Sequence, residues 1–448
     1  MAFSNVIQAF ITCVSPIRCS RYIFSRFNPG GNDANIFPYF VVIQKRQTLD
    51  TLHPREQGRT VIFWNAIVVK LSGIWRRIRS RGRFSWIILA VAAFVLRGVL
   101  ARYPQIVETV YARGIFVLIR NTFDYTLGRQ PLPAVYFFGA LMIFWVARAV
   151  WRTVRRLKGA SNERIGFVVR DQALSLTAIA AAITLFFMML WGYNYARPRI
   201  STQLGLRMAE LSTAELIEEG RWAAHEAAAA RRALVDGFEG NWPNALPNKQ
   251  LEKHVRRSLV ETLRQMGYSP PGKPRIRTFR AGGLMLHVSV SGFYFPFTGE
   301  AYISGGLLPI ERPFVAAHEM AHAYGFTDEG EANFLAWMAC RRSEDPWVAY
   351  SGKLRYLMSI ETRIRMRAPQ RSAGLLLGIP ISVLNDMARI REYHQRFGGG
   401  IIAGSWWRVY DVYLKSLGVT AGTVSYRRMV PLAIAWRRLN AGRVESMP

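Results

Sequence analysis

The pattern of apolar positions divides the chain into three parts. Residues 1–60 show no hydrophobic period, three long apolar runs follow, and from about residue 201 the hydropathy falls to that of a soluble domain. A helix needs about 20 apolar residues to cross a bilayer, within a range of about 17–25. The runs therefore predict transmembrane helices over about residues 85–101, 133–151 and 173–193.

The first 60 residues predict little regular structure. The stretch "NPGGNDANIFP" is typical of a loop, and "KRQTLDTLHPREQGR" of a solvated polar segment. The first 14 residues are apolar but have neither a charged start nor a small-residue cleavage site, so no cleaved signal peptide is expected. We interpret residues 1–60 as a poorly ordered extension.

The charge of the chain points to a membrane rather than to nucleic acid. Lys and Arg number 59 against 29 Asp and Glu, which gives a formal net charge of +30. Many of the arginines stand at the ends of the apolar runs, and no zinc knuckle or ribonucleoprotein sequence accompanies them. The expected partner is therefore the lipid bilayer, and no nucleic acid is expected.

The distribution of arginine predicts the orientation in the cell (inner) membrane. Residues 76–83 and 152–170 are rich in arginine, whereas the connection over residues 102–133 has fewer and partly offset basic residues. Basic residues near the ends of spans favour the cytoplasmic side. The N-terminus is then cytoplasmic, and three crossings place residues 201–448 outside the cytoplasm.

The part after residue 201 has the pattern of an α-rich α+β domain. A long helix is predicted from "STAELIEEGRWAAHEAAAARRALV", which opens with Ser212 and Glu215 in capping-box spacing. The stretch "GLMLHVSVSGFYFPF" alternates as a strand does, and "FPFTGEAYISG" is a candidate edge strand for pairing with an extended peptide. The remainder is largely helical. The fold class is thus a mainly α membrane protein with three transmembrane helices followed by an α-rich α+β domain of zincin type.

The stretch "PFVAAHEMAHAYGFTDEGEANFLAWMAC", residues 313–340, carries the candidate chemistry. Pro313 suits the first turn of a helix and Gly325 its end. His318 and His322 are four residues apart, so both imidazoles lie on one face and can bind a single Zn²⁺ ion. Glu319 follows the first histidine and is placed to act as general base toward a metal-bound water.

A third metal ligand must come from the acidic residues beyond the glycine. Asp328 follows Gly325 at a spacing that some zinc proteases use, and Glu331 begins a second apolar-patterned helix from which a carboxylate can reach back. We favour Glu331 as the third ligand and keep Asp328 as the alternative. Glu329 is expected to accept a hydrogen bond from a ligand.

Several motifs give the chain a resemblance to a known family. They are "LWGYNYAR" (residues 190–197), "SGFYFPFTGEAYIS" (291–304), "HEMAHAYGF" with "DEGEANFLAWMAC" (318–340), "VYDVYLKSLG" and "GTVSY". With them the chain resembles a family of bacterial membrane-anchored zinc metallopeptidases with a gluzincin-like site, catalogued largely as a domain of unknown function. The resemblance runs from about residue 85 to residue 439. It implies three spans followed by a metallopeptidase domain, and it supports Glu331 as a ligand.

The functional hypothesis is a membrane-anchored zinc peptidase that hydrolyses peptide bonds of a peptide or protein substrate. A peptidase needs a hydrogen-bond donor to stabilise the oxyanion, and the phenols of Tyr350, Tyr356 and Tyr426 are candidates. Three rival readings remain at this point. They are an intramembrane zinc protease, a non-catalytic membrane scaffold with structural zinc or none, and a zinc hydrolase that does not act on peptides.

Overall fold

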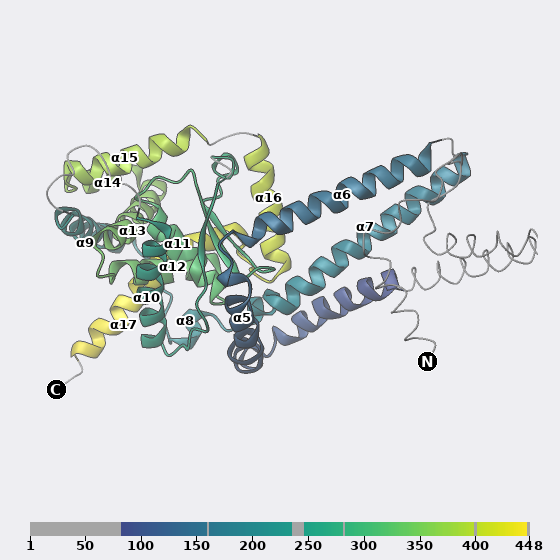
Figure 1. Ribbon diagram of the computed structural model, residues 1–448. Helices are drawn as coiled ribbons and strands as arrows, with labels where there is room; N and C mark the ends of the chain where they lie inside the picture. Colours follow the sequence, from purple (N-terminus) through teal and green to yellow (C-terminus); the bar gives the residue numbers. More distant parts are fainter. Residues whose placement is uncertain (1–81, 159–160, 235–245, 281–282, 398–400, 446–448) are drawn as a thin grey trace, which may run out of the picture. The chain divides into compact units, whose positions relative to one another are not determined.

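The computed structural model describes residues 82–158, 161–234, 246–280, 283–397 and 401–445 (Figure 1). The extension predicted for residues 1–60 lies outside the described residues. Residues 80–155 and 161–448 form one compact unit, to which the description below refers. Its described part is mainly helical, as predicted, with one three-stranded sheet.

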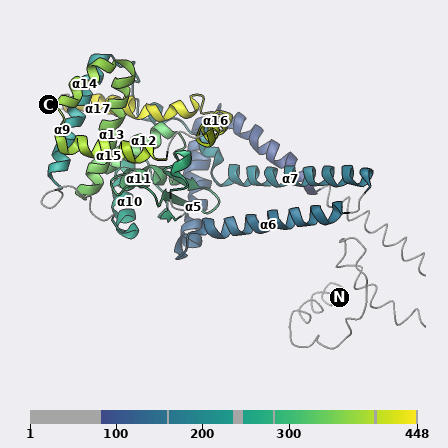
Figure 2. The ribbon, with the colours of Figure 1, turned by 90° about the horizontal axis from the view of Figure 1, so that it is seen from above.

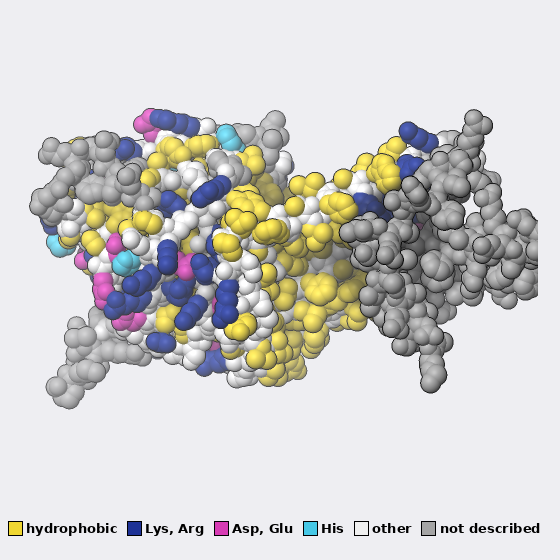
Figure 3. Space-filling model, viewed as in Figure 1, with side chains coloured by type: hydrophobic (Ala, Val, Ile, Leu, Met, Phe, Trp, Pro, Cys, Tyr) yellow, Lys and Arg dark blue, Asp and Glu magenta, His cyan; other side chains and the backbone are white. Residues whose placement is uncertain are grey.

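Three helices are long and apolar enough to cross a membrane. They are Gly82–Leu100, α6 (Ala134–Leu157) and the Ile165–Leu190 part of α7 (Asn162–Leu190), with mean hydropathies of 1.8, 1.7 and 2.2. Hydrophobic side chains cover their visible surface (Figure 3), and few of their residues are buried by the protein itself. The prediction of three such helices is confirmed. Both α6 and α7 are longer than predicted because the basic turns at their ends also remain helical.

The connection between the first two spans folds against the C-terminal domain. It contains α4 (Pro104–Ile106), the π-helix η1 (Val107–Ile115), α5 (Phe116–Tyr125) and η2 (Leu127–Arg129). Arg120 donates to the carbonyl of Gly299, and Arg275 Nη1 donates to the carbonyl of Gly128 at 2.7 Å. The connection and the part of the chain after α7 therefore lie at the same end of these helices.

The sheet has the strand order β1-β3-β2, with β1 (Ile276–Phe279) parallel and β2 (Gly292–Phe295) antiparallel to β3 (Glu300–Ser304). The prediction that "FPFTGEAYISG" supplies an edge strand is wrong, because β3 is paired on both sides. The alternation along a strand does not reveal whether its backbone is paired once or twice. The edge strands are β1 and β2.

Glu300 ties the second span to this sheet. Its buried carboxylate accepts a hydrogen bond from the backbone N–H of Ala134, the first residue of α6, at 2.8 Å. The other oxygen pairs with Arg277 Nε at 2.8 Å, and the Tyr302 hydroxyl also donates to this carboxylate. A buried carboxylate is stable only when it is paired in this way.

The C-terminal domain is built from helices around α12, which runs through its centre. The Ser212–Glu215 capping box is confirmed, with Glu215 N donating to Ser212 Oγ at 3.2 Å and Ser212 N to Glu215 Oε2 at 2.6 Å. The helical elements are η3 (Gly192–Ala196), α8 (Ile200–Gln203), α9 (Thr213–Arg232), α10 (Asn248–Gln265), η4 (Leu286–Val288), α11 (Arg312–Ala323), α12 (Glu329–Arg341), α13 (Pro346–Arg367), α14 (Pro369–Leu377), α15 (Ile381–Gln395), α16 (Ile401–Ser416), η5 (Gly422–Arg428) and α17 (Met429–Glu445).

The core around α12 is what fixes the elements of the site. This helix contacts α10, α11, α13 and α17, and its residues from Glu329 to Cys340 are all buried. Trp337 stacks on Tyr356 of α13 with ring centroids 4.5 Å apart. Burying a large apolar side chain contributes about 1.5–3 kcal/mol, so the packing of α12 against α11 is strongly favoured.

Candidate metal centre

The helix that carries the His-Glu-x-x-His motif is α11. Pro313 stands in its first turn, as predicted. The helix ends before Gly325, whose φ of +87° is a left-handed conformation that glycine adopts without strain. A Cβ at Gly325 would lie only 3.0 Å from Asn194 Oδ1, so the turn also requires the smallest residue for space. This sharp turn returns the chain toward α11 and starts α12 beside it.

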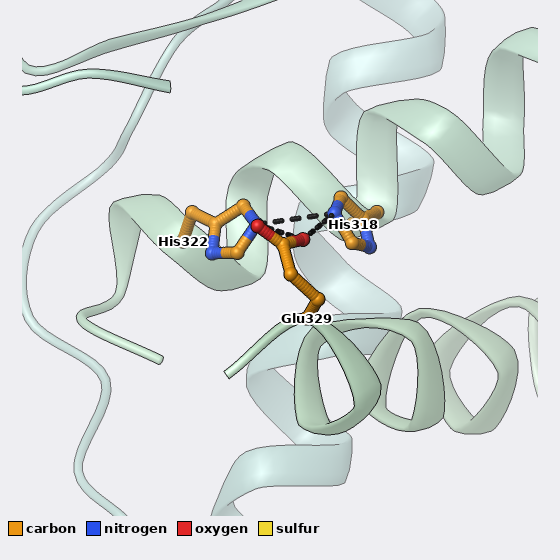
Figure 4. A group of neighbouring side chains, drawn as sticks. All are labelled: His318, His322 and Glu329. Atoms are coloured by element: carbon orange, nitrogen blue, oxygen red, sulfur yellow. Dashed lines mark hydrogen bonds and ion pairs between the residues drawn. The ribbon is translucent and has the colours of Figure 1, made fainter. Parts of the chain in front are cut away.

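Three side chains converge between α11 and α12 (Figure 4). The Nε2 atoms of His318 and His322 are 3.0 Å apart, and Glu329 Oε2 lies 3.2 Å from the first and 3.3 Å from the second. Zinc binds nitrogen and oxygen ligands at about 2.0–2.1 Å in a tetrahedron, whose corners are then about 3.3–3.4 Å apart. The three separations are close to these edges, so the cluster fits three ligands of one metal ion.

Two hydrogen bonds orient these ligands from outside. His322 Nδ1 lies 2.6 Å from the carbonyl oxygen of Phe326. In the tautomer with the proton on Nδ1, this N–H donates to the carbonyl and the Nε2 lone pair is directed at the cluster. The hydroxyl of Tyr410, on α16, donates to Glu329 Oε1 at 2.5 Å and leaves Oε2 for the histidines. Partners of this kind fix ligand orientation and basicity in metal sites.

The structure does not bring Glu331 to the histidines, and this corrects the predicted ligand set. Its Oε1 accepts from the backbone N–H of Ile200 at 2.8 Å, on another side of α12. Successive helical residues are turned by about 100°, so residues two apart point in nearly opposite directions. Almost all of α12 is buried, so apolar residues lie on every side of this helix. The apolar neighbours of Glu331 therefore do not show which side of α12 faces the histidines. Glu329 takes the place predicted for Glu331.

Asp328, the alternative third ligand, begins α12 instead. Its Oδ1 accepts from the backbone N–H groups of Gly330 and Glu331 at 3.0 and 3.1 Å, which is the N-cap arrangement. Its Oδ2 pairs with Arg428 at 2.9 Å. The carboxylate therefore determines where α12 starts, and so determines that Glu329 falls on the face toward α11.

Glu319 lies in the same cleft, against the edge strand β2. A Cβ placed on Gly292 would be 2.7 Å from Glu319 Oε1, so the glycine is what allows the carboxylate to approach the strand. Burial raises the pKa of the Glu319 carboxyl to about 8. A carboxyl with a pKa near neutrality can both accept and return a proton, which is the property of a general base that later acts as acid.

The ionisable groups of the cluster shift one another's pKa values. Burial alone would lower the pKa of His322, but the carboxylates of Glu329 and Glu319 raise it to about 9. Burial is the main cause that lowers the pKa of His318. Burial would raise the pKa of Glu329, but His322 and His318 hold it well below its usual range. The cluster thus holds Glu329 as a carboxylate, the form that binds a metal.

The cluster opens into a cleft of about 590 Å³, whose wall is more apolar than polar. Of the three candidate tyrosines only Tyr426 lines it, with its ring parallel to that of His318 at a centroid distance of 6.4 Å. Tyr350 donates to Asp386 at 2.7 Å and Tyr356 to Glu219 at 2.9 Å, both within the helical core. These two tyrosines have structural roles that their position in the sequence did not reveal.

The segment after the third span forms part of the site, and local patterns in the sequence do not predict such a contact between distant residues. Trp191 Nε1 donates to the backbone carbonyl of His322 at 2.9 Å, and its indole lines the cleft. Arg197 Nη1 donates to the carbonyl of Gly325 at 3.1 Å and its Nε pairs with Glu108 at 2.7 Å. The motif "LWGYNYAR" therefore joins the end of α7 to the metal-motif helix.

The fold and the site define a mainly helical protein with three candidate membrane spans and a buried His-His-Glu cluster in an apolar cleft. The chain belongs to the family described as Protein of unknown function (DUF3810), whose model matches residues 111–434. The matched region includes two of the spans and every residue of the cluster. No curated protein and no solved structure gives a significant match. The family has no described activity, so membership in it lends no support to zinc or to peptide cleavage.

Proposed function

We propose that this protein is a zinc-dependent peptidase anchored in the cell (inner) membrane, with its N-terminus in the cytoplasm and its C-terminal domain outside. The observation that carries the proposal is the approach of His318, His322 and Glu329 to within 3.0–3.3 Å of one another, beside Glu319, in a cleft large enough for a peptide. When bound there, zinc would supply Lewis acidity and lower the pKa of a water molecule.

The residues around the cluster have the positions that peptide hydrolysis needs. Glu319 holds a carboxyl with a pKa of about 8 beside the cluster, where it can take a proton and deliver it to a leaving amine. The edge strand β2 lies next to Glu319 and offers backbone groups with which an extended peptide can pair. Tyr426 is the one predicted tyrosine in the cleft and is the candidate donor to the oxyanion.

The position of the cluster separates this proposal from an intramembrane protease. His318 and His322 lie on α11, a helix of 12 residues inside the C-terminal domain. The three candidate spans within the described residues do not include it. The scaffold and the non-peptidase hydrolase are distinguished by experiment.

The test uses the full chain purified in detergent, with metal analysis and cleavage of a peptide mixture followed by mass spectrometry. We expect about one zinc per chain, cleavage by the wild type, and a loss of about 10²-fold or more in Glu319→Gln with zinc retained. Glu344→Gln, at an exposed glutamate, is the matched control. Equal cleavage by wild type and Glu319→Gln would refute the catalytic role, and zinc without any peptide cleavage would favour another hydrolase or the scaffold.

A further inference from the structure

The candidate metal centre lies next to the end of a span. Trp191 is the first residue after α7, and besides its hydrogen bond to His322 its ring centroid is 6.1 Å from that of His322. Phe187, in the last turn of α7, also lines the cleft. The cleft is therefore bounded on one side by the point where the third span leaves the bilayer.

Helix α16 forms another wall of the cleft and rests on the ends of two spans. Tyr413 of α16 contacts Phe187 of α7, with ring centroids 6.2 Å apart. Arg97, near the end of the first span, donates to the carbonyl of Leu417, and Leu417 packs with Met188. Arg97 is thus held by the domain, whereas the sequence alone suggests only a side chain near the membrane surface.

The direction of α16 is that of a helix lying along a membrane surface. In Figure 1 it stands across the direction of α6 and α7, and in Figure 2, turned by 90°, it is seen nearly end-on while the spans are seen from the side. Both views agree that α16 runs across the direction of the spans. Because spans cross the bilayer, a helix that runs across them at their ends lies along its surface.

One face of α16 outside the cleft is apolar. Val409 and Val412 are 65% and 67% exposed and three residues apart, so they share this face, whereas Trp406, 45% exposed, lines the cleft. Arg408 and Lys415, both exposed, flank that face. An exposed apolar face with flanking basic residues is typical of a helix bound at a lipid interface. The opposite side supplies Trp407 and Tyr410 to the cleft.

The edge strand β2 leads from the cluster to a span. Gly292, at its start, is next to Glu319, whereas Phe295, at its end, contacts Phe138 of α6 with ring centroids 5.1 Å apart. Three residues of extended chain cover about 10 Å. A peptide paired with β2 would therefore pass from the reacting position to the side of a transmembrane helix within a few residues.

We propose that α16 lies in the headgroup region of the bilayer with Val409 and Val412 toward the acyl chains. We further propose that the cleft takes the juxtamembrane segment of a membrane-anchored polypeptide as its substrate. The second statement rests on the proposed peptidase function and gives it a substrate class. The first stands on the position and the exposed side chains of α16 alone.

The bilayer contact is tested without any activity measurement. Spin labels are attached to single cysteines at positions 409 and 412 of the full chain in vesicles, with Cys13 and Cys19 replaced by serine and the buried Cys340 kept. Labels at position 415 and at Leu377, which is 90% exposed on α14, are the controls. We expect labels at 409 and 412 to be accessible to oxygen and protected from a water-soluble nickel complex, unlike the controls. Water-like accessibility at both positions would overturn the contact.

The substrate class is tested with a random peptide library fused to a transmembrane helix and reconstituted with the enzyme, beside the same library free in solution. We expect cleavage within about ten residues of the membrane end, since β2 spans only about 10 Å. Val412→Asp should lower cleavage of the tethered library by about tenfold and leave the free library unchanged, whereas Leu377→Asp should alter neither. Cleavage sites spread evenly along the tether would overturn the substrate class. Zinc binding without cleavage of either library would refute the peptidase function itself.

Discussion

Replacing each of two glutamates of α12 with glutamine, in separate variants, tests the assignment of the metal ligands. Glu329 and Glu331 are two residues apart, both are buried, and only Glu329 reaches the histidines. Glu329→Gln removes one charged ligand from the cluster. Glu331→Gln keeps an oxygen that can accept from Ile200 N, now 2.8 Å from the carboxylate.

The expected loss of zinc affinity in Glu329→Gln follows from the number of ligands. Structural zinc sites bind with about 10–16 kcal/mol at neutral pH, which shared over four ligands is about 2.5–4 kcal/mol each. With 1.4 kcal/mol for each factor of ten, loss of the Glu329 carboxylate should weaken zinc binding by about 10²- to 10³-fold. For Glu331→Gln we expect a change of less than about threefold, because its carboxylate lies outside the cluster.

The assay is competition for zinc with a chromophoric chelator, on the full chain in detergent. Circular dichroism before metal addition shows that both variants are folded. If Glu331→Gln loses zinc while Glu329→Gln keeps it, the geometry of α12 described above is wrong and the predicted ligand Glu331 is restored. Equal losses in both variants would mean that neither carboxylate has been assigned correctly.

Three further predictions concern the surroundings of the cluster. Tyr410→Phe removes the donor to Glu329 Oε1 and should weaken zinc binding about 10- to 100-fold in the same competition assay, whereas Tyr393→Phe, away from the cluster, should not. Glu300→Ala removes the carboxylate that pairs with Arg277 and should destabilise the protein by about 3–5 kcal/mol, measured as a lower thermal midpoint. Glu344→Ala, at an exposed ion pair, should change stability by less than about 0.5 kcal/mol. Gly292→Ala places a Cβ 2.7 Å from the carbonyl oxygen of Tyr302 and 2.7 Å from Glu319 Oε1, so peptide cleavage should fall while zinc stays bound. Gly374→Ala, whose added Cβ meets no atom within 4 Å, is the control. Unchanged cleavage by Gly292→Ala would contradict the proposed place of Glu319.

The sequence predicted those features that depend on local pattern. The spans follow from the length of the apolar runs, and the capping box from the spacing of Ser212 and Glu215. His318 and His322 share a face because they are four residues apart on a helix, and Glu319 lines the same cleft.

The features that were missed depend on where an element begins or on contacts between distant parts of the chain. Asp328 caps α12, and this starting point turns Glu329 rather than Glu331 toward α11. The Asp328–Glu331 spacing is itself that of an N-cap and the third helical residue, so this signal was present in the sequence. Tyr410 reaches Glu329 from α16, 81 residues further along, and local periodicity contains no information on such a contact.

The hydrogen bond from Trp191 to His322 bears on how the protein can be dissected. Residues 201–448 produced by themselves would lack the indole that donates to this carbonyl. They would also lack Tyr195, which lines the cleft, and Arg197, which donates to the carbonyl of Gly325. The wall of the cleft would then be open to solvent and a buried acceptor would lose its donor. The segment that follows the third candidate span is thus a component of the pocket, and a fragment that begins at residue 201 would have an incomplete cleft.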